Sequence, residues 1–317
     1  MMVATNFGDT RLRSSAEVAV SQGRFMILEL RLAPATEPSN RETAPASTRS
    51  EEMNRSTCGQ WAAFGSHRER IERLILRHLR KADRLLLESP PARLCALGAG
   101  NCNDLDLRFL CDRVGEVHLL DIDAAALEAA AGRQRAGNLA NLHRHAPVDL
   151  TAPGDLPDRL GRFDIVVSSC VLSQLIAGLR DRLGAEHPRF RSERTLTIAH
   201  HLRLMHNLLA PGGSAILIND VVSTDTVPRL RQVPPGDLPG LMRQLIADGK
   251  AFRGLDPATI CFALDRLPVP VVRNWSSPWL WHLSALRSFL VYGLVFRVQG
   301  SGFSEERRRR ANTETCK

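Results

Sequence analysis

Short apolar segments alternate with segments of helical periodicity between about residues 90 and 220. The clearest apolar segment is Phe163–Ser169, where Ile165, Val166 and Val167 form the continuous run that is typical of a buried parallel strand. Parallel neighbours in a sheet are joined by crossover connections, which are usually helices. The alternation therefore predicts an α/β fold with a doubly wound, mostly parallel sheet.

The other predicted elements follow the same order along the chain. Further strands are predicted at Arg93–Leu97, Glu116–Asp121, Leu142–Val148 and Ser214–Asn219, and two closing strands at Val269–Asn274 and Ser288–Val298. Helices are predicted before the first strand and between later strands, at Ser66–Leu87, Asn103–Val114, Ala124–Gly137 and Thr197–Leu209. Residues 221–267 are rich in proline and break the alternation, so they predict a helical insertion after the fifth strand.

Composition divides the chain into three parts. Residues 1–57 are rich in Ser, Thr, Ala, Pro and Arg, and they predict a disordered leader. Residues 58–302 predict a single domain, with a cofactor-binding core at about 90–220 and a substrate-side region at about 221–285. Residues 303–317 contain a run of arginines and predict a basic, disordered tail.

Charge and cysteine content restrict the partners and the compartment. The formal net charge of +8 leaves nucleic acid open as a partner, but only three of the 42 basic residues are lysine, a bias that more often reflects genome composition than phosphate contacts. The seven cysteines show no zinc-site spacing, so no metal site is predicted. Without a secretory signal or a disulfide pattern, the sequence predicts a cytoplasmic protein. The longest apolar stretch, Leu280–Val298, contains His282 and Arg287, which argues against a membrane span.

A glycine-containing junction lies between the first predicted strand and the next helix. Its sequence is Gly98-Ala99-Gly100-Asn101-Cys102. Glycine permits a tight turn and a close approach of the backbone to a ligand, and the following helix offers free N–H groups. In a dinucleotide-binding fingerprint the third glycine would stand where this chain has an asparagine, which argues against NAD or FAD.

Carboxylates follow the next two predicted strands. Asp121 ends the second strand, where an acidic side chain can accept hydrogen bonds from both ribose hydroxyls of a nucleoside. Asp149 follows the third strand and can accept a hydrogen bond from an adenine amine, while Ile122 and Leu150 cover the ring faces. Taken alone, Asp121 can be a turn or cap residue and Asp149 is more often a turn residue. Asp123 opens the next helix and is predicted to be its N-cap.

Two further motifs complete the set. Ser168 and Ser169 end the buried fourth strand beside the glycine loop, and Pro211-Gly212-Gly213 separates a helix from the fifth strand.

In this order and spacing, the five motifs resemble the class I S-adenosylmethionine-dependent methyltransferases. The resemblance covers about residues 90–220 and implies a Rossmann-like sheet of seven strands whose last strand runs antiparallel. It implies S-adenosylmethionine as the cofactor, with Gly98, Ala99, Gly100 and Asn101 along its methionine part, Asp121 at the ribose, Ile122, Asp149 and Leu150 at the adenine, and Ser168 and Ser169 near the sulfonium. There are two departures from the family pattern: Ala96 replaces a frequent acidic residue, and Cys102 replaces the usual third glycine.

The resemblance implies an enzyme that transfers a methyl group. Because the motifs of common nucleic-acid and arginine methyltransferases are absent, a small-molecule acceptor is favoured over nucleic acid. This chemistry has no universal catalytic motif, so no catalytic residue is assigned. Candidate bases are Asp220 and the histidines His187, His200, His201, His206 and His282. The aromatic residues Trp275, Trp279, Trp281 and Tyr292 predict either an acceptor pocket or, more strongly, a core plug.

Three alternatives stay open from the sequence. They are a non-catalytic protein of the same fold that binds S-adenosylmethionine or a partner, an NAD(P)-dependent oxidoreductase, and a basic RNA-modifying enzyme.

Overall fold

The computed structural model describes residues 46–83 and 91–298, which all belong to one compact unit, Thr43–Lys317. The predicted tail and the first 45 residues of the predicted leader lie outside the described residues. Residues 46–57 were assigned to the leader by composition, and this assignment is wrong, because they form a helix, α1 (Ala46–Thr57).

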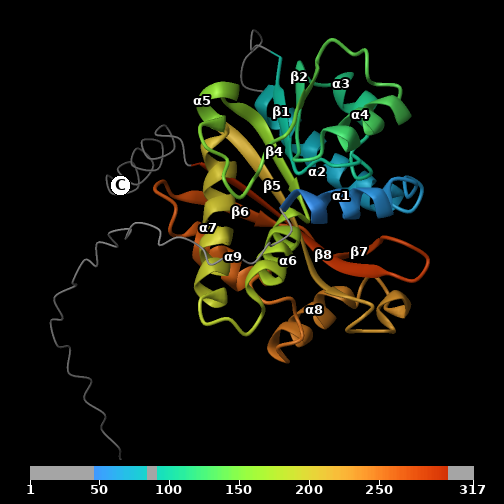
Figure 1. Ribbon diagram of the computed structural model, residues 1–317, viewed down its shortest axis with the longest axis vertical. Coiled ribbons are helices and arrows are strands. Elements are labelled where there is room, and N and C mark those ends of the chain that lie inside the picture. The colour runs from blue at the N-terminus through green and yellow to red at the C-terminus, as the bar shows by residue number, and fades with distance from the viewer. Residues whose placement is uncertain (1–45, 84–90, 299–317) are drawn as a thin grey trace, which may run out of the picture. The chain divides into compact units, whose positions relative to one another are not determined.

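A single eight-stranded sheet forms the centre of the described structure (Figure 1). Its order is β3-β2-β1-β4-β5-β8-β6, and β7 pairs with β8 beside this path. Strands β1 to β5 are parallel, whereas β8 runs antiparallel to β5, β6 and β7. The strands are β1 Arg93–Leu97, β2 Glu116–Leu120, β3 Leu142–His145, β4 Phe163–Ser169, β5 Leu209–Ser223, β6 Val271–Trp275, β7 Trp279–His282 and β8 Ser288–Val298.

The predicted fold class is confirmed by this sheet, with one addition. The first five strands are parallel and the last strand is antiparallel, as the resemblance implies. Strand β7 was not predicted, so the sheet has eight strands rather than seven. The short β7 forms a hairpin with β8 across a turn in which Leu283 N and Ser284 N both bond to Arg287 O.

Helices cover both faces of the sheet. They are α2 Gly65–Asp83, α3 Leu107–Cys111, α4 Ala124–Arg133, α5 Leu156–Leu160, α6 Val171–Leu183, α7 Phe190–Asn207, the 3₁₀ helix η1 Leu230–Gln232, α8 Leu238–Ala247 and α9 Pro257–Leu264. Because side chains alternate along a strand, Ile165 and Val167 of β4 pack with α2, α3 and α4, while Val166 packs with α6, α7 and α9. The helices η1, α8 and α9 lie between β5 and β6, which confirms the predicted insertion.

Local sequence explains where several elements begin. The helix after the glycine loop starts at Leu107 rather than Asn103, because the Asp106 carboxylate accepts a hydrogen bond from Phe109 N and caps it. Asp123 caps α4 in the same way, as predicted, by accepting from Ala126 N. Strand β5 is longer than predicted and includes the Pro-Gly-Gly sequence, where the register with β4 shifts. At Gly213 a Cβ would lie 2.9 Å from the Phe163 carbonyl oxygen, so only glycine fits this register shift.

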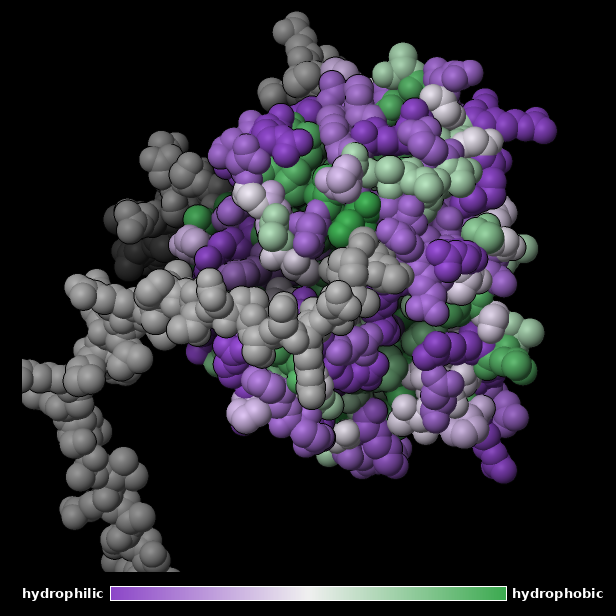
Figure 2. Space-filling view, in the orientation of Figure 1, coloured by the Kyte–Doolittle hydropathy of each residue, from purple (hydrophilic) through white to green (hydrophobic). Residues whose placement is uncertain are grey.

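The face of the molecule seen in Figure 2 is mostly polar. In Figure 2 hydrophilic residues cover most of the visible face, and hydrophobic residues are confined to small separate patches. Within the described ranges, no helix combines the length and the apolar character needed to cross a membrane. The six cysteines whose side chains are described are all free. Cytoplasmic localisation stays a prediction.

Candidate ligand-binding cavity

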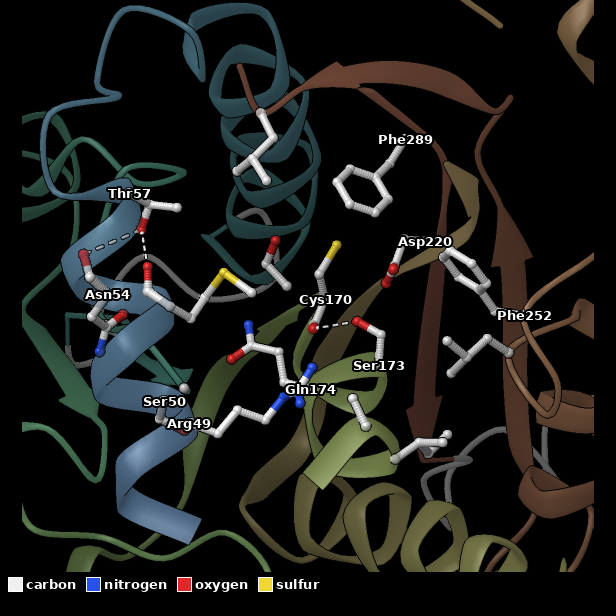
Figure 3. A pocket seen from close by; sticks show the side chains of 18 of the residues that line it. Arg49, Ser50, Asn54, Thr57, Cys170, Ser173, Gln174, Asp220, Phe252 and Phe289 are labelled. Carbon is white, nitrogen blue, oxygen red and sulfur yellow. Dashed lines mark hydrogen bonds between the residues drawn. The ribbon is translucent and has the colours of Figure 1, made fainter. Parts of the chain in front are cut away.

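A cavity of about 610 Å³ lies at the carboxyl ends of β1, β4 and β5 (Figure 3). The chain leaves β1 toward β2 and β3 on one side and reaches β4 and β5 on the other, so this is the switch point of the sheet, where open α/β sheets bind ligands. Its walls come from α1, the glycine loop, α6, α7, the insertion and the β7–β8 hairpin. The volume lies within the usual range of about 300–1,000 Å³ for small-molecule sites.

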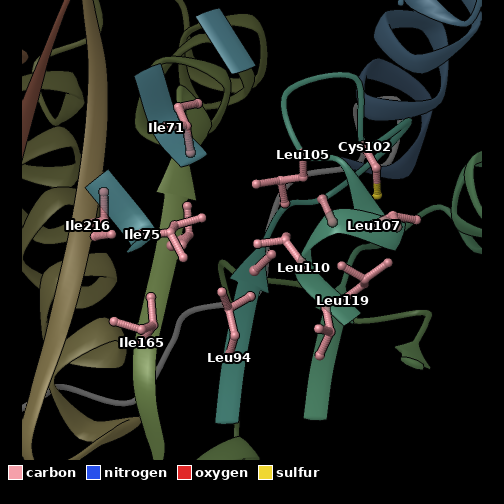
Figure 4. Close-up of a cluster of buried hydrophobic side chains, with 14 of the residues drawn as sticks. Ile71, Ile75, Leu94, Cys102, Leu105, Leu107, Leu110, Leu119, Ile165 and Ile216 are labelled. Atoms are coloured by element: carbon pink, nitrogen blue, oxygen red, sulfur yellow. The ribbon is translucent and has the colours of Figure 1, made fainter. Parts of the chain in front are cut away.

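The glycine loop has a left-handed backbone at three alternate positions. The φ angles are +61° at Gly98, +47° at Gly100 and +48° at Cys102. Cys102 therefore adopts the left-handed conformation that a glycine would adopt most readily, and its side chain packs with Leu105 and Leu107 in the core (Figure 4). The loop thus keeps a left-handed backbone at its third position, although Cys102 stands where the family usually has glycine.

Helix α1 covers the glycine loop through hydrogen bonds. The Asn101 side-chain amide donates to the Asn54 carbonyl oxygen and, at 3.0 Å, to Thr57 Oγ1. The Asn103 amide donates to the Thr57 carbonyl oxygen at 2.8 Å, and Asn54 Nδ2 donates to Asp123 Oδ2 at 3.0 Å. Asn54 and Thr57 are seen on α1 at the cavity wall in Figure 3. The composition of residues 46–57 does not indicate this helix, because its hydrogen-bond partners are loop groups some 45 residues away in the chain.

Asp121 joins the second strand to the glycine loop. Its Oδ2 accepts from Gly100 N at 2.7 Å and its Oδ1 accepts from Asp123 N at 2.9 Å. Burial raises the pKa of this carboxyl, and the hydrogen bonds from the two backbone N–H groups oppose the rise. Because each carboxylate oxygen can accept more than one hydrogen bond, Asp121 holds the loop and can still accept from a ligand in the cavity.

The structure brings six of the ten predicted site residues to the cavity and leaves four away from it. Those that line it are Gly98, Ala99, Gly100, Asn101, Asp121 and Ser169, and those that do not are Ile122, Asp149, Leu150 and Ser168.

The four outlying residues have other surroundings. Asp149 is exposed, and its Oδ1 accepts from the backbone N and the hydroxyl of Thr151. Leu150 is buried in the core with α6 and α7, and the fully buried Ser168 pairs with His201 Nε2 at 2.8 Å. Ile122 is half-buried beside Asp121.

Asp220 is a buried carboxylate at the wall of the cavity. It is 4% exposed, and its Oδ1 has no hydrogen-bond partner among the described residues. Burial raises its pKa to about 6, although hydrogen bonds with Ser173 and Cys170 limit the rise. Figure 3 shows the carboxylate between Cys170 and Phe252. Of the candidate bases named from sequence, Asp220 alone reaches this cavity within the described part of the chain.

The histidines lie elsewhere: no histidine of the described residues lines the cavity. His201 is buried against Ser168, and burial lowers its pKa to about 4. His282 bonds to Ser288 in the β7–β8 hairpin. The five histidines proposed from sequence are therefore not placed to act on a ligand there.

The tryptophans do not form one cluster. Trp281 lines the cavity and stacks on His67, with 4.8 Å between the ring centroids. Trp279 is buried and its Nε1 donates to His67 Nδ1 at 3.1 Å. Because this ring nitrogen accepts, the His67 proton lies on Nε2, which faces Ser169 Oγ at 3.5 Å, and burial lowers the His67 pKa to about 3. Trp275 packs on Tyr292 and is 44% exposed. Trp279 thus belongs to the core, Trp281 lines the cavity, and an acceptor pocket at Trp281 stays a prediction.

A second polar cluster lies on the far strands, β2 and β3. Glu116, His118 and His143 each place one potential ligand atom within 4.8 Å of the others, a proximity that cysteine and histidine spacing did not predict. The Glu116 carboxylate already accepts from Arg93 Nε at 2.6 Å and from His118 Nε2 at 3.0 Å. Arg93 neutralises this carboxylate, so the cluster is an ion-paired and hydrogen-bonded network on the sheet. The absence of a bound metal stays a prediction.

The strand order and the glycine loop define the class of the fold. The chain has a Rossmann-like sheet whose last strand runs antiparallel, as the sequence resemblance implies.

No protein-family model and no curated protein matches the chain. Among solved structures it is similar to the magnesium protoporphyrin IX methyltransferase ChlM from Synechocystis PCC 6803 with bound SAH, at 15% identity and a TM-score of 0.41 over 72% of this chain and 83% of that one. It is also similar to the CurJ carbon methyltransferase, at 20% identity and a TM-score of 0.37, over 68% of this chain and 51% of that one. An O-methyltransferase family protein from Burkholderia thailandensis matches at 14% identity and a TM-score of 0.37, over 75% of this chain and 60% of that one. The match thus spans about half of CurJ, and the fold rests on the strand order of the chain itself.

Proposed function

We propose that this protein binds S-adenosylmethionine at the glycine loop and catalyses transfer of its methyl group to a small-molecule acceptor in the same cavity. The observation that carries the proposal is the convergence of three separate motifs. The loop at Gly98–Asn101, Asp121 after β2 and Ser169 after β4 all line one cavity, which extends to a buried carboxylate, Asp220.

The residues of the cavity fit this cofactor chemically. Asp121 offers carboxylate lone pairs to a ribose, and the left-handed loop lines the cavity at Gly98 and Gly100, which carry no side chain. Asn103 lines the same cavity, and its buried Oδ1 has no hydrogen-bond partner among the described residues, so it can accept from the amino group of the methionine part.

When bound, S-adenosylmethionine supplies a methyl group on a positive sulfonium, which an acceptor atom takes to leave a neutral thioether. The protein must then position the acceptor, exclude water and remove a proton. Asp220 is the residue proposed to accept that proton, because its pKa of about 6 lies near neutral pH, where a base is most effective.

Calorimetry with three ligands tests the cofactor. We expect S-adenosylmethionine and S-adenosylhomocysteine to bind with micromolar affinity, about −8 kcal/mol, and NAD to give no heat. Heat with NAD alone would instead support the oxidoreductase alternative.

Replacing Asp121 tests the ribose contact. The Asp121→Ala variant is expected to lose about 1–3 kcal/mol of S-adenosylhomocysteine binding, because a buried hydrogen-bonded carboxylate is removed. Asp149→Ala is the matched control, since Asp149 is exposed and lies outside the cavity. Urea unfolding of both variants separates lost binding from lost stability, because Asp121 also holds Gly100 N and Asp123 N. Equal binding by Asp121→Ala and the native chain would assign Asp121 to the loop alone.

A further inference from the structure

We propose that the part of the cavity lined by α7 and the insertion binds an oxyanion attached to a flat apolar body, such as the carboxylate of a hydroxylated aromatic acid. The proposal deepens the proposed function and rests on it, because it takes this part of the cavity to be the acceptor site. It names the chemical class of the acceptor.

Arginines from separate segments line the cavity. They are Arg49 of α1, Arg180 of α6, Arg194 of α7, Arg253 of the insertion and Arg287 of the β7–β8 hairpin. Three of them already have carboxylate partners: Arg49 and Arg180 pair with Asp181, and Arg287 Nη2 lies 2.9 Å from Asp225. Arg49 and Arg180 share one carboxylate, so their combined charge is only half balanced, whereas Arg287 has a carboxylate partner of its own.

Arg194 and Arg253 differ, because neither forms an ion pair with any described residue. Arg194 is half-buried, and its pKa is lowered by burial and by repulsion from Arg253 and Arg191, with Asp256 in partial opposition. The Asp256 oxygens already accept from the backbone and hydroxyl of a threonine at the start of α9. Two neighbouring guanidinium groups at one cavity wall thus have no ion-pair partner among the described residues, and guanidinium recognises planar oxyanions in bidentate geometry.

Apolar side chains stand next to these two arginines. Phe190 lies in the first turn of α7, with its ring centroid 5.7 Å from the Arg194 guanidinium carbon, and Phe252 directly precedes Arg253. Phe252 and Phe289 face the cavity on either side of Asp220 in Figure 3. A ligand whose flat rings lie between these aromatic side chains and whose anionic group meets the two arginines matches this arrangement.

The segment that carries Arg253 is held in place by the sheet. Phe252 N donates to the Val221 carbonyl oxygen at 2.7 Å, and the Tyr292 hydroxyl donates to the Leu255 carbonyl oxygen at 2.8 Å. Asn219 Nδ2 in turn donates to the same hydroxyl at 3.1 Å. The bond from Phe252 holds the segment on one side of Arg253, and the buried Tyr292, 1% exposed, holds it on the other. The backbone that carries Arg253 is therefore preorganised, and the exposed side chain lines the cavity from it.

Calorimetry with matched probes tests the inference. The chain is saturated with S-adenosylhomocysteine and titrated with 6-hydroxy-2-naphthoate, its neutral analogue 6-hydroxy-2-naphthamide, or 2-naphthyl phosphate. We expect the naphthoate to bind at least about tenfold more tightly than the naphthamide, as charge-assisted hydrogen bonds require. Arg194→Gln and Arg253→Gln should each weaken naphthoate binding by about tenfold and leave naphthamide binding unchanged. Tighter binding of the phosphate ester would support the oxyanion site and identify a phosphate as the source.

Arg191→Gln is the matched control, because Arg191 is exposed on the same helix and does not line the cavity. Equal affinity for the naphthoate and the naphthamide, binding of neither probe, or an equal loss in Arg191→Gln and Arg194→Gln would overturn the inference. The proposed function fails separately, if S-adenosylhomocysteine does not bind in its own titration. The naphthoate is then titrated alone, and its dependence on Arg194 and Arg253 still reports on the anion site.

Discussion

At about pH 8, the Asp220→Asn variant is expected to be more stable than the native chain, with a free energy of unfolding about 3 kcal/mol higher. Burial raises the pKa of Asp220 from about 4 to about 6, so the folded state binds this proton more tightly than the unfolded state. The cost of the buried charge is fully present above about pH 6 and absent below about pH 4. Asparagine has no charge to bury, so its advantage should fade as the pH falls through this window.

Urea unfolding across this pH range, followed by tryptophan fluorescence, measures the effect. Asp237→Asn is the control, because Asp237 is exposed and its side chain makes no cap hydrogen bond at α8. If the free energies of unfolding of Asp220→Asn and the native chain differed by the same amount at every pH, the raised pKa of Asp220 would be contradicted. The same variant should transfer methyl groups about 10²–10⁴-fold more slowly to an acceptor that must lose a proton. Greater stability together with lower activity is the behaviour of a functional group that is retained at a cost to the fold.

The second large effect concerns Gly98. Replacing Gly98 by alanine is expected to destabilise the fold by about 3 kcal/mol, because two penalties add. The residue has a φ of +61°, which disfavours a Cβ, and that Cβ would lie 2.7 Å from Val171 Cγ2. Val171 is buried at the start of α6 and has little room to move. Equilibrium unfolding in urea measures the loss.

A double-mutant cycle separates the two penalties. In the Gly98→Ala, Val171→Ala double variant both Cγ atoms are gone, and the nearest remaining atom of residue 171, its Cβ, lies 3.6 Å away. The two changes should therefore destabilise the fold by about 1–2 kcal/mol less together than the sum of their separate effects. Simple additivity would show that the backbone conformation alone excludes alanine.

The parallel part of the fold could be predicted because it is encoded locally. The bounds of β1, β4 and β8 follow from short apolar runs that are flanked by polar residues or glycine. The caps Asp106 and Asp123 act within three residues of their own positions, and Asp123 was recognised from sequence for this reason. Strand β7 was missed because its four residues are stabilised by pairing with β8 rather than by a pattern of their own.

The cavity was only partly predictable, because its walls come from distant segments. The glycine loop and Asp121 are close in sequence and belong to a recognisable order of motifs. Asp149 follows its strand at the expected place, yet its carboxylate is occupied by Thr151 in an exposed turn. Arg194 and Arg253 are 59 positions apart, and no local pattern shows that they share a wall.

The polar attachment of α1 has a kinetic consequence for any ligand beneath it. The bonds from Asn101, Asn103 and Asn54 can each be replaced by water, and each is worth only about 0.5–1.5 kcal/mol. Breaking them together costs a few kcal/mol, so we expect α1 to be open in about one molecule in 10²–10³ at any moment. We expect a ligand held between α1 and the glycine loop to leave faster during those openings. Its residence time, and with it the rate at which product is released, would then be governed by the helix as well as by the affinity of the site.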